Sequence, residues 1–282
     1  MLNTDRQPDC EKIELANPTM NPMISATDRA PQPAFRPAGL FGGLPHPATV
    51  REVRTENYRI RTLVLDACIP QARPGQFVMA WLPGLEEAPF SLAHHAPAAL
   101  TVARVGPFTE ALHRLAVGDR LWLRGPYGQP FRAETGVQRP LLVGGGYGAA
   151  PLAFLAEALL AHNQRPIALV GGRTAADIIG LERFRQLDVP AVVTTEDGSL
   201  GEAGLITAPV ARMVCSGEGE ALYGVGPHGM LEALEGLARA YGLPAQLSWE
   251  ASIGCCLGLC GKCEHTDGSL LCIEGPVRSV TH

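Results

Sequence analysis

The sequence predicts a multidomain β plus α/β protein, with a small antiparallel β-barrel, a parallel-sheet domain and a C-terminal cysteine loop. Short apolar runs separated by turns fill about residues 50–131, which is typical of a small barrel or sandwich. From residue 139 onward, strands, glycine turns and helices alternate, which is typical of a parallel sheet covered by helices. Five cysteines then crowd into residues 255–272. We divide the chain into residues 1–45, 46–135, 136–245 and 246–282.

Composition narrows the class of protein before any motif is considered. Of 282 residues, 46% are hydrophobic and 18% are charged, which is enough apolar material for real cores. The formal charge of −5 gives no basic footprint for nucleic acid, and no apolar run reaches the roughly 18 residues of a membrane span. The start of the chain has no positively charged leader region. We therefore expect a cytoplasmic protein that binds neither nucleic acid nor membrane.

The first two segments differ in their patterning. Residues 1–45 are rich in proline and have no sustained hydrophobic period, which predicts a flexible arm. In the barrel segment, apolar runs predict strands at 58–65, 76–81, 100–105 and 121–124. A helix is predicted over 109–115 with Thr109 as its N-cap. Pro89-Phe90-Ser91 stands at a strand start, and His94 and His95 are expected in a surface loop.

The third segment repeats one pattern of strand, glycine turn and helix. Strands are predicted at 141–143, 167–170, 191–195 and 221–225, and helices at 152–160, 181–186 and 229–241. Glycine turns follow two of the strands, at Gly144–Gly148 and Gly224–Met230. Such turns lie at the carboxyl ends of parallel strands, where a pyrophosphate can approach the backbone and a helix N-terminus. Because many α/β proteins have glycine turns that bind nothing, a purely structural role remains the alternative.

The cysteine loop has the spacing C-x4-C-x2-C-x8-C, from four residues: Cys255, Cys260, Cys263 and Cys272. The first three positions fit the plant-type 2Fe-2S order. A structural zinc site is the main alternative, although zinc sites usually use two C-x2-C knuckles and only one is present. A disulfide is disfavoured because cytosolic thiols stay reduced. Cys10, Cys68 and Cys215 are scattered and are interpreted as buried apolar side chains or bystanders.

Taken together, these motifs resemble a known family. Pro89-Phe90-Ser91, Gly125-Pro126-Tyr127-Gly128 and the two glycine turns resemble the ferredoxin-reductase superfamily. The cysteine segment, ending Cys272-Ile273-Glu274-Gly275-Pro276-Val277, is similar to the electron-transfer subunits of class B dihydroorotate dehydrogenases. The resemblance covers about residues 48–279, and the cysteine motif is its most specific part.

The resemblance implies an FAD-binding barrel, an NAD-binding α/β domain and a 2Fe-2S segment. The FAD residues it implies are Pro89, Phe90, Ser91, Arg104, Val105, Gly106 and Thr109. The NAD residues are Gly144, Gly145, Gly146, Gly148, Gly226, Pro227 and Met230. The cluster ligands are Cys255, Cys260, Cys263 and Cys272. Two positions depart from the family: Ala88 replaces an arginine of the flavin motif, and Cys256 replaces a glycine, so that Cys255 is taken as the ligand.

By the same resemblance, the chain is an oxidoreductase subunit that moves electrons between a partner's FMN and NAD. The implied partner is an FMN-containing catalytic subunit that oxidises dihydroorotate in pyrimidine biosynthesis, in a hetero-oligomer. No acid or base residue is required for such transfer, and none is assigned. Two alternatives remain. The chain could serve as an NAD(P)H reductase subunit of a sulfhydrogenase or ferredoxin:NADP oxidoreductase, or as a non-catalytic zinc-binding interaction module.

Overall fold

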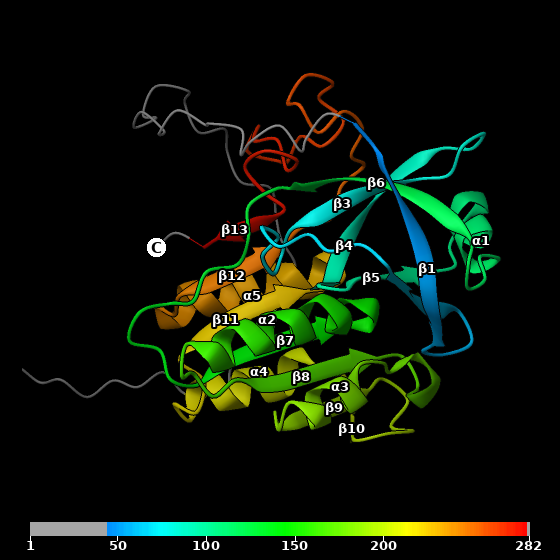
Figure 1. Ribbon diagram of the computed structural model, residues 1–282. Coiled ribbons are helices and arrows are strands. Elements are labelled where there is room, and N and C mark those ends of the chain that lie inside the picture. Colours follow the sequence, from blue (N-terminus) through cyan, green and yellow to red (C-terminus); the bar gives the residue numbers. More distant parts are fainter. Residues whose placement is uncertain (1–43, 281–282) are drawn as a thin grey trace, which may run out of the picture.

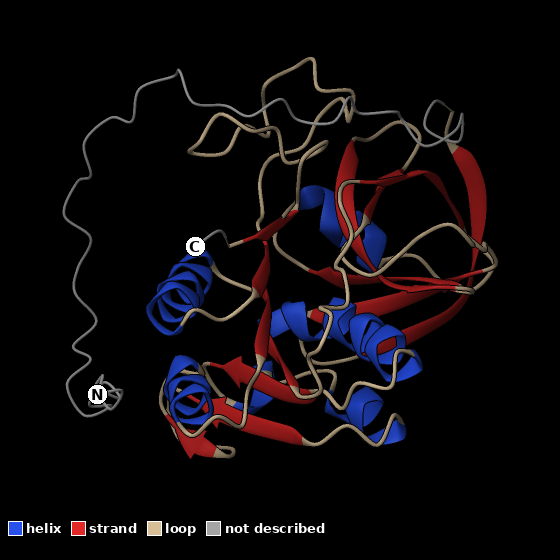
Figure 2. Ribbon diagram, turned by 90° about the vertical axis from the view of Figure 1, so that its left-hand side faces the viewer, coloured by secondary structure: helices blue, strands red, loops and turns tan. Residues whose placement is uncertain are grey.

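The structure, a computed structural model, describes residues 44–280 and contains a closed β-barrel beside a sheet covered by helices on both faces (Figures 1 and 2). The predicted arm, residues 1–45, lies outside the described residues except for its last two positions. The predicted fold class, a small antiparallel barrel with an α/β domain, is confirmed. Among the described residues, no helix is long and apolar enough to cross a bilayer.

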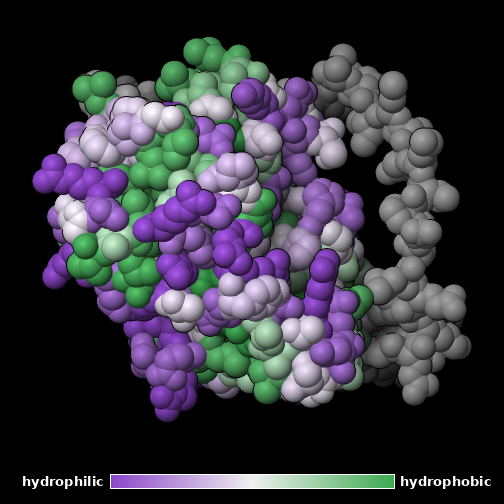
Figure 3. Space-filling model, turned by 90° about the vertical axis from the view of Figure 1, so that its right-hand side faces the viewer, coloured by the Kyte–Doolittle hydropathy of each residue, from purple (hydrophilic) through white to green (hydrophobic). Residues whose placement is uncertain are grey.

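The barrel consists of six strands in the order β1-β2-β5-β4-β3-β6, and every neighbouring pair is antiparallel. The strands are β1 (His46–Thr55), β2 (Ile60–Leu65), β3 (Phe77–Trp81), β4 (Glu87–His95), β5 (Ala98–Ala103) and β6 (Arg120–Tyr127). Leu63, Val78, Leu92 and Leu100 fill the interior. Pairing of β1 with β6 closes the barrel and leaves no open edge. Figure 3 views the barrel side, where apolar and hydrophilic residues are interspersed.

Two details of the barrel segment correct the sequence-based expectations. Helix α1 (Pro107–His113) has Gly106 as its N-cap, so the prediction of Thr109 as N-cap was wrong. The Thr109 hydroxyl instead accepts hydrogen bonds from the N–H groups of Val105 and Gly106, at 2.9 Å each, from inside the first turn.

His94 and His95 were expected in a surface loop, but they end strand β4. His94 Nε2 lies 3.3 Å from Glu157 Oε2, and the His95 ring stacks on Phe154 with centroids 5.1 Å apart. Glu157 and Phe154 belong to helix α2 (Ala149–Ala161) of the α/β domain. The two histidines therefore pack the barrel against that helix.

The second sheet has seven strands in the order β10-β9-β8-β7-β11-β12-β13. They are β7 (Pro140–Gly145), β8 (Ile167–Gly172), β9 (Ala191–Thr195), β10 (Glu202–Ala203), β11 (Ala221–Val225), β12 (Ala245–Ser248) and β13 (Val277–Ser279). All pairs are parallel except β12 with β13. The sheet is thus mixed where a parallel sheet was predicted, and its last strand comes from the end of the chain.

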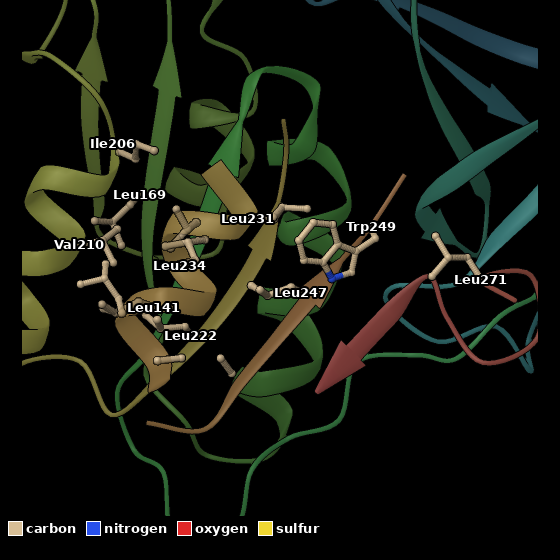
Figure 4. Packing of buried hydrophobic residues seen from close by; sticks show 14 of the residues in the cluster. Leu141, Leu169, Ile206, Val210, Leu222, Leu231, Leu234, Leu247, Trp249 and Leu271 are labelled. Carbon is tan, nitrogen blue, oxygen red and sulfur yellow. The ribbon is translucent and has the colours of Figure 1, made fainter. Parts of the chain in front are cut away.

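Alternating side chains of the central strands enter two separate cores. Leu141 and Leu169 face α4 (Thr207–Cys215) and α5 (His228–Tyr241), whose apolar side chains point at the sheet in Figure 4. Leu142 of the same strand β7 instead packs against α2 and α3 (Leu181–Gln186). Each fully buried Leu or Val contributes about 1.5–3 kcal/mol. Both faces of the sheet are therefore stabilised, which fixes the strand ends that carry the glycine turns.

Candidate functional site

A cavity of about 280 Å³ lies where the barrel, the α/β domain and the C-terminal segment meet. Its walls are mainly apolar and include Phe77, Phe90, Trp249 and Ile253. The barrel contributes β3, β4 and β5, while the α/β domain contributes the glycine turn before α2 and the end of β11. The chain that follows β12 completes the enclosure. Three segments far apart in the sequence thus form one concave, mostly apolar site.

The structure brings most of the predicted flavin residues to this cavity. Pro89, Phe90 and Ser91 lie side by side in its wall on β4, and Val105 and Thr109 line it as well. Arg104 and Gly106 do not line it, and the Arg104 side chain is exposed. Ala88, which takes the place of the family's arginine, also borders the cavity.

The two predicted glycine turns pack directly against each other. A Cβ on Gly145 would lie 2.6 Å from Pro227 Cδ and 3.1 Å from Met230 Sδ. A Cβ on Gly226 would lie 2.9 Å from the backbone nitrogen of Gly145. Only backbones without side chains can approach this closely. Gly148 lines the cavity, whereas the other predicted residues of these turns do not. They are Gly144, Gly145, Gly146, Gly226, Pro227 and Met230.

The cavity residues that sequence reasoning missed include Tyr147, Trp249 and Glu250. Tyr147 and Glu250 face each other across it, with the Tyr147 hydroxyl donating to Glu250 Oε2 at 3.1 Å. Burial, together with the Glu250 charge, raises the pKa of Tyr147 to about 12, so the phenol stays protonated and can donate. Trp249 is buried between His228 and His265, with ring centroids 4.9 and 5.1 Å away. Of these three residues, only Tyr147 could have been suspected from the sequence, because it lies within a glycine turn.

The cysteine loop holds its four predicted ligands in two neighbouring pairs. The side chains of Cys255 and Cys260 interact, as do those of Cys263 and Cys272. The backbone N–H of Cys272 also donates to Cys263 Sγ at 3.4 Å. Burial and the hydrogen bond with Cys263 raise the pKa of Cys272, and the charge of the nearby Cys255 adds to the effect. Within residues 44–280, no three His, Cys, Asp or Glu side chains already converge as a group that could hold a metal ion.

Backbone donors make one of these thiols strongly acidic. N–H groups of Leu257, Leu259 and Cys260 point at Cys255 Sγ and lower its pKa to about 6. A thiolate is the form that binds metal. Burial has the opposite effect on the adjacent Cys256 and raises its pKa to about 12. The two neighbouring thiols therefore differ in acidity.

The loop backbone also fits an iron–sulfur cluster better than an ordinary side-chain core. Cys256 has a φ of +60°, in the left-handed region that glycine prefers. A Cβ on Gly254 would lie 3.3 Å from Cys260 Sγ, so a side chain there would crowd the sulfur. Gly258 has a φ of +73° and donates its N–H toward Cys272. Close backbone approach and N–H donors to sulfur are features that tune such clusters.

Comparison with known proteins identifies the family. No protein-family model matches the chain. The probable dihydroorotate dehydrogenase B (NAD(+)) electron transfer subunit of Methanocaldococcus jannaschii is 34% identical, over 81% of this chain and 87% of its own length. Its counterpart from Methanopyrus kandleri is 38% identical, over 83% of this chain and 89% of its length. The chain belongs to the family of dihydroorotate dehydrogenase B electron-transfer subunits.

Solved structures agree with this membership. An NADH-dependent reduced ferredoxin–NADP oxidoreductase superposes with a TM-score of 0.74 at 26% identity, covering 82% of this chain and 87% of the other. A cytochrome P450 reductase from Amycolatopsis superposes with a TM-score of 0.59 at 27% identity, covering 70% and 66%. Like other dihydroorotate dehydrogenase B electron-transfer subunits, the chain is an electron-transfer oxidoreductase with the ferredoxin-reductase fold. The expected cofactors, FAD, a 2Fe-2S cluster and NAD, are confirmed for this class.

Proposed function

We propose that this subunit carries electrons between the FMN of a dihydroorotate dehydrogenase catalytic subunit and NAD, in dihydroorotate oxidation for pyrimidine biosynthesis in the cytoplasm. One observation supports it above the others. The cavity wall contains the barrel residues of the flavin motif, the glycine turn at Tyr147 and Gly148, and the chain that leads from Trp249 into the cysteine loop. A flavin bound there touches the nucleotide side and the cluster side at once.

Each part of the site has a separate task in this proposal. A bound FAD would supply chemistry that links the two electron carriers, because a flavin can exchange single electrons with an iron–sulfur cluster and a hydride with a nicotinamide. Phe77, Phe90 and Trp249 exclude water from the ring system, and Ser91 provides a hydroxyl beside it. The two glycine turns present bare backbone to the NAD pyrophosphate. Cys255, Cys260, Cys263 and Cys272 hold the cluster, because they combine an acidic thiol with backbone donors.

The flavin assignment predicts the effect of restoring the family's arginine. Ala88→Arg adds a guanidinium that can pair with the FAD pyrophosphate through charge-assisted hydrogen bonds. The Kd for FAD is expected to fall about tenfold, equivalent to about 1.4 kcal/mol. Titration of the apoprotein, followed by quenching of flavin fluorescence, measures it. Ala88→Met, which adds length without charge, should not tighten binding. Loss of FAD from the arginine variant alone would show that the pocket is built differently from that of the family, and that the assignment of Pro89, Phe90 and Ser91 is wrong.

The partner surface is proposed to lie on the cysteine loop itself. Leu257 and Leu259 are 62% and 82% exposed, and Cys260, which follows Leu259 in the sequence, is exposed as well. Figure 1 shows this orange-to-red loop standing above β6 and β13 at one end of the molecule. Electrons leave a buried cofactor only where a partner can approach closely. An apolar rim around an exposed ligand meets that need for the catalytic subunit.

A charged side chain introduced into this apolar rim is expected to weaken binding of the catalytic subunit without changing the flavin or iron content. Leu257→Asp or Leu259→Asp should weaken binding of the catalytic subunit at least tenfold, since truncating or charging an apolar anchor costs about 2 kcal/mol. Flavin and iron content should stay at wild-type levels. Leu205→Asp is the matched control, because Leu205 is 58% exposed but belongs to the approach to α4. Equal effects of all three variants would contradict the assigned surface.

Co-purification with the candidate catalytic subunit tests the function as a whole. The complex, prepared anaerobically, should show flavin and iron–sulfur absorption and should reduce NAD when dihydroorotate is added. A coloured protein that reduces ferredoxin but never engages a dihydroorotate dehydrogenase would favour the second candidate, a reductase subunit of another complex. That candidate draws support from the 26% identity to the NADH-dependent ferredoxin–NADP oxidoreductase. A colourless protein with bound zinc would overturn both.

A further inference from the structure

One arginine joins the barrel to the cysteine loop through all of its donors. Arg124 lies on β6, and only 12% of its side chain is exposed. Its Nε and Nη2 donate to the two oxygens of Glu87 at 2.5 and 2.7 Å. Its Nη1 donates to the Tyr127 hydroxyl at 3.0 Å. The remaining contacts cross to the loop: Nη1 reaches the Cys255 carbonyl at 3.2 Å, and Nη2 reaches the Gly254 carbonyl at 3.3 Å.

This arrangement uses the whole guanidinium. Arginine has five N–H groups in a fixed fork, and Arg124 has five acceptors within 3.3 Å. Lysine, with three donors on a point charge, could not satisfy the same set. Glu87 is a neighbour on β4 and orients the fork, while the two loop carbonyls lie on its other side. Such a site fixes the backbone immediately before the Cys255 sulfur.

The same side chain lies between the cavity and the loop. Tyr127, which accepts from Arg124 and packs under it with the guanidinium carbon 5.4 Å from the ring centre, contacts Phe77 at 5.8 Å between ring centroids. Phe77 lines the cavity. On the opposite side, the charge of Arg124 is felt by Cys256. A permanent positive charge therefore sits beside the ligand loop, in a place where solvent screening is reduced.

We propose that Arg124 is a positioning residue for the iron–sulfur site, which holds the Gly254 and Cys255 carbonyls and raises the reduction potential of the bound cluster through its charge. The inference rests on the proposed assignment of the cluster to these cysteines. Reduction adds one negative charge to a cluster, so a nearby cation stabilises the reduced form more than the oxidised form. Glu87 offsets part of this effect. Arg124 thereby makes the transfer of an electron from the partner's FMN to the cluster more favourable, which is the first step of this subunit in dihydroorotate oxidation.

The test is a redox titration of the full-length holoprotein, with the cluster followed by electron paramagnetic resonance and the flavin by absorbance. Arg124→Met should lower the midpoint potential of the cluster. Arg124→Lys keeps the charge but loses loop contacts, so it should give a smaller decrease and altered resonance line widths. Glu87→Gln removes the opposing carboxylate and should raise the potential. Arg61→Met is the matched control, because Arg61 is a barrel arginine that donates to a different carbonyl, that of His113.

We expect the midpoint potential of the cluster to shift in opposite directions in the Arg124→Met and Glu87→Gln proteins. If Arg124 only held the loop in place, the sign of the shift would not follow the sign of the removed charge. Shifts of the same sign, or none in proteins with full cluster content, would overturn the role of Arg124. If Arg124→Met does not assemble a cluster, the Glu87→Gln shift decides. A wild-type protein without a 2Fe-2S resonance would instead overturn the cluster assignment, so the two failures are distinguishable.

Discussion

Cys255→Ser is expected to abolish the iron–sulfur signal while the protein keeps its FAD. The reason lies in the loop: Cys255 is the thiol whose pKa falls to about 6 under three backbone donors, whereas a serine hydroxyl is not ionised near neutral pH. Iron and sulfide should fall to near zero, and the electron paramagnetic resonance signal should disappear. Reduction of the flavin by NADH should survive, because the cavity and the glycine turns contain none of the loop cysteines.

The adjacent thiol provides the control. Cys256 has a φ of +60°, which glycine adopts without strain, and its thiol is buried with a pKa of about 12. Cys256→Gly should therefore retain full iron and sulfide content. If Cys256→Gly lost the cluster and Cys255→Ser kept it, the ligand register of the loop would be shifted by one residue.

Gly148→Ala is expected to destabilise the α/β domain more than any other single methyl addition at the glycine turns. A Cβ at this position would lie 2.1 Å from the Val225 carbonyl oxygen, which belongs to the backbone of β11 and cannot move aside. Forcing strand and turn apart should cost about 3 kcal/mol or more, in the upper range for overpacking. Chemical denaturation followed by circular dichroism measures the loss, and NADH reduction of the flavin should fall with it.

The matched control is a glycine of the second turn whose surroundings are open. A Cβ on Gly229 would meet nothing within 4 Å, and the residue lies in the first turn of α5. Gly229→Ala should leave stability unchanged or raise it by up to about 1 kcal/mol, through better helix propensity. Comparable losses in both variants would show that the close contact at Gly148 is not the cause.

Local patterns predicted those elements whose signals lie within a few residues. The helix at 181–186 and the strand at 191–195 have the predicted bounds, because apolar periodicity and flanking turns mark them directly. Helix α4 was missed because Pro209 interrupts its pattern, although proline is tolerated in a first helical turn. Strand β13 has three residues, and only its pairing with β12 makes it a strand. Pairing over such a sequence distance leaves no local trace.

The residues of the candidate site also fall into two groups: those that a local sequence pattern indicates, and those that only the fold brings together. The spacing of the cysteines indicated all four of them, and the composition of the turn indicated Gly148, because both patterns involve residues that are close together in the sequence. Tyr147 and Glu250 are 103 positions apart, and they meet only because β7 and β12 run parallel on either side of β11, so that both strands end at the same edge of the sheet. Arg124 lies 131 positions before Cys255 and contacts its carbonyl for a similar reason. Contacts created by topology cannot be read from a single sequence.

The cysteine loop leaves the sheet and returns to it at partners in one antiparallel pair, Ser248 and Val277. Both ends of the loop are therefore fixed at the same position of the β12–β13 pair. Gln129, which follows β6, also holds the returning end, because its side-chain nitrogen donates a hydrogen bond to the Ile273 carbonyl at 3.0 Å. Topologically, the loop is an insertion between two adjacent strands, and a short hairpin could replace it without changing strand order. Loss of the cluster through oxidation should thus leave the strand order of both sheets unchanged, although Trp249, Glu250 and Ile253 at the start of the insertion also line the cavity. The subunit would lose its electron connection to the partner, and a change in its FAD affinity would report whether the start of the insertion has moved.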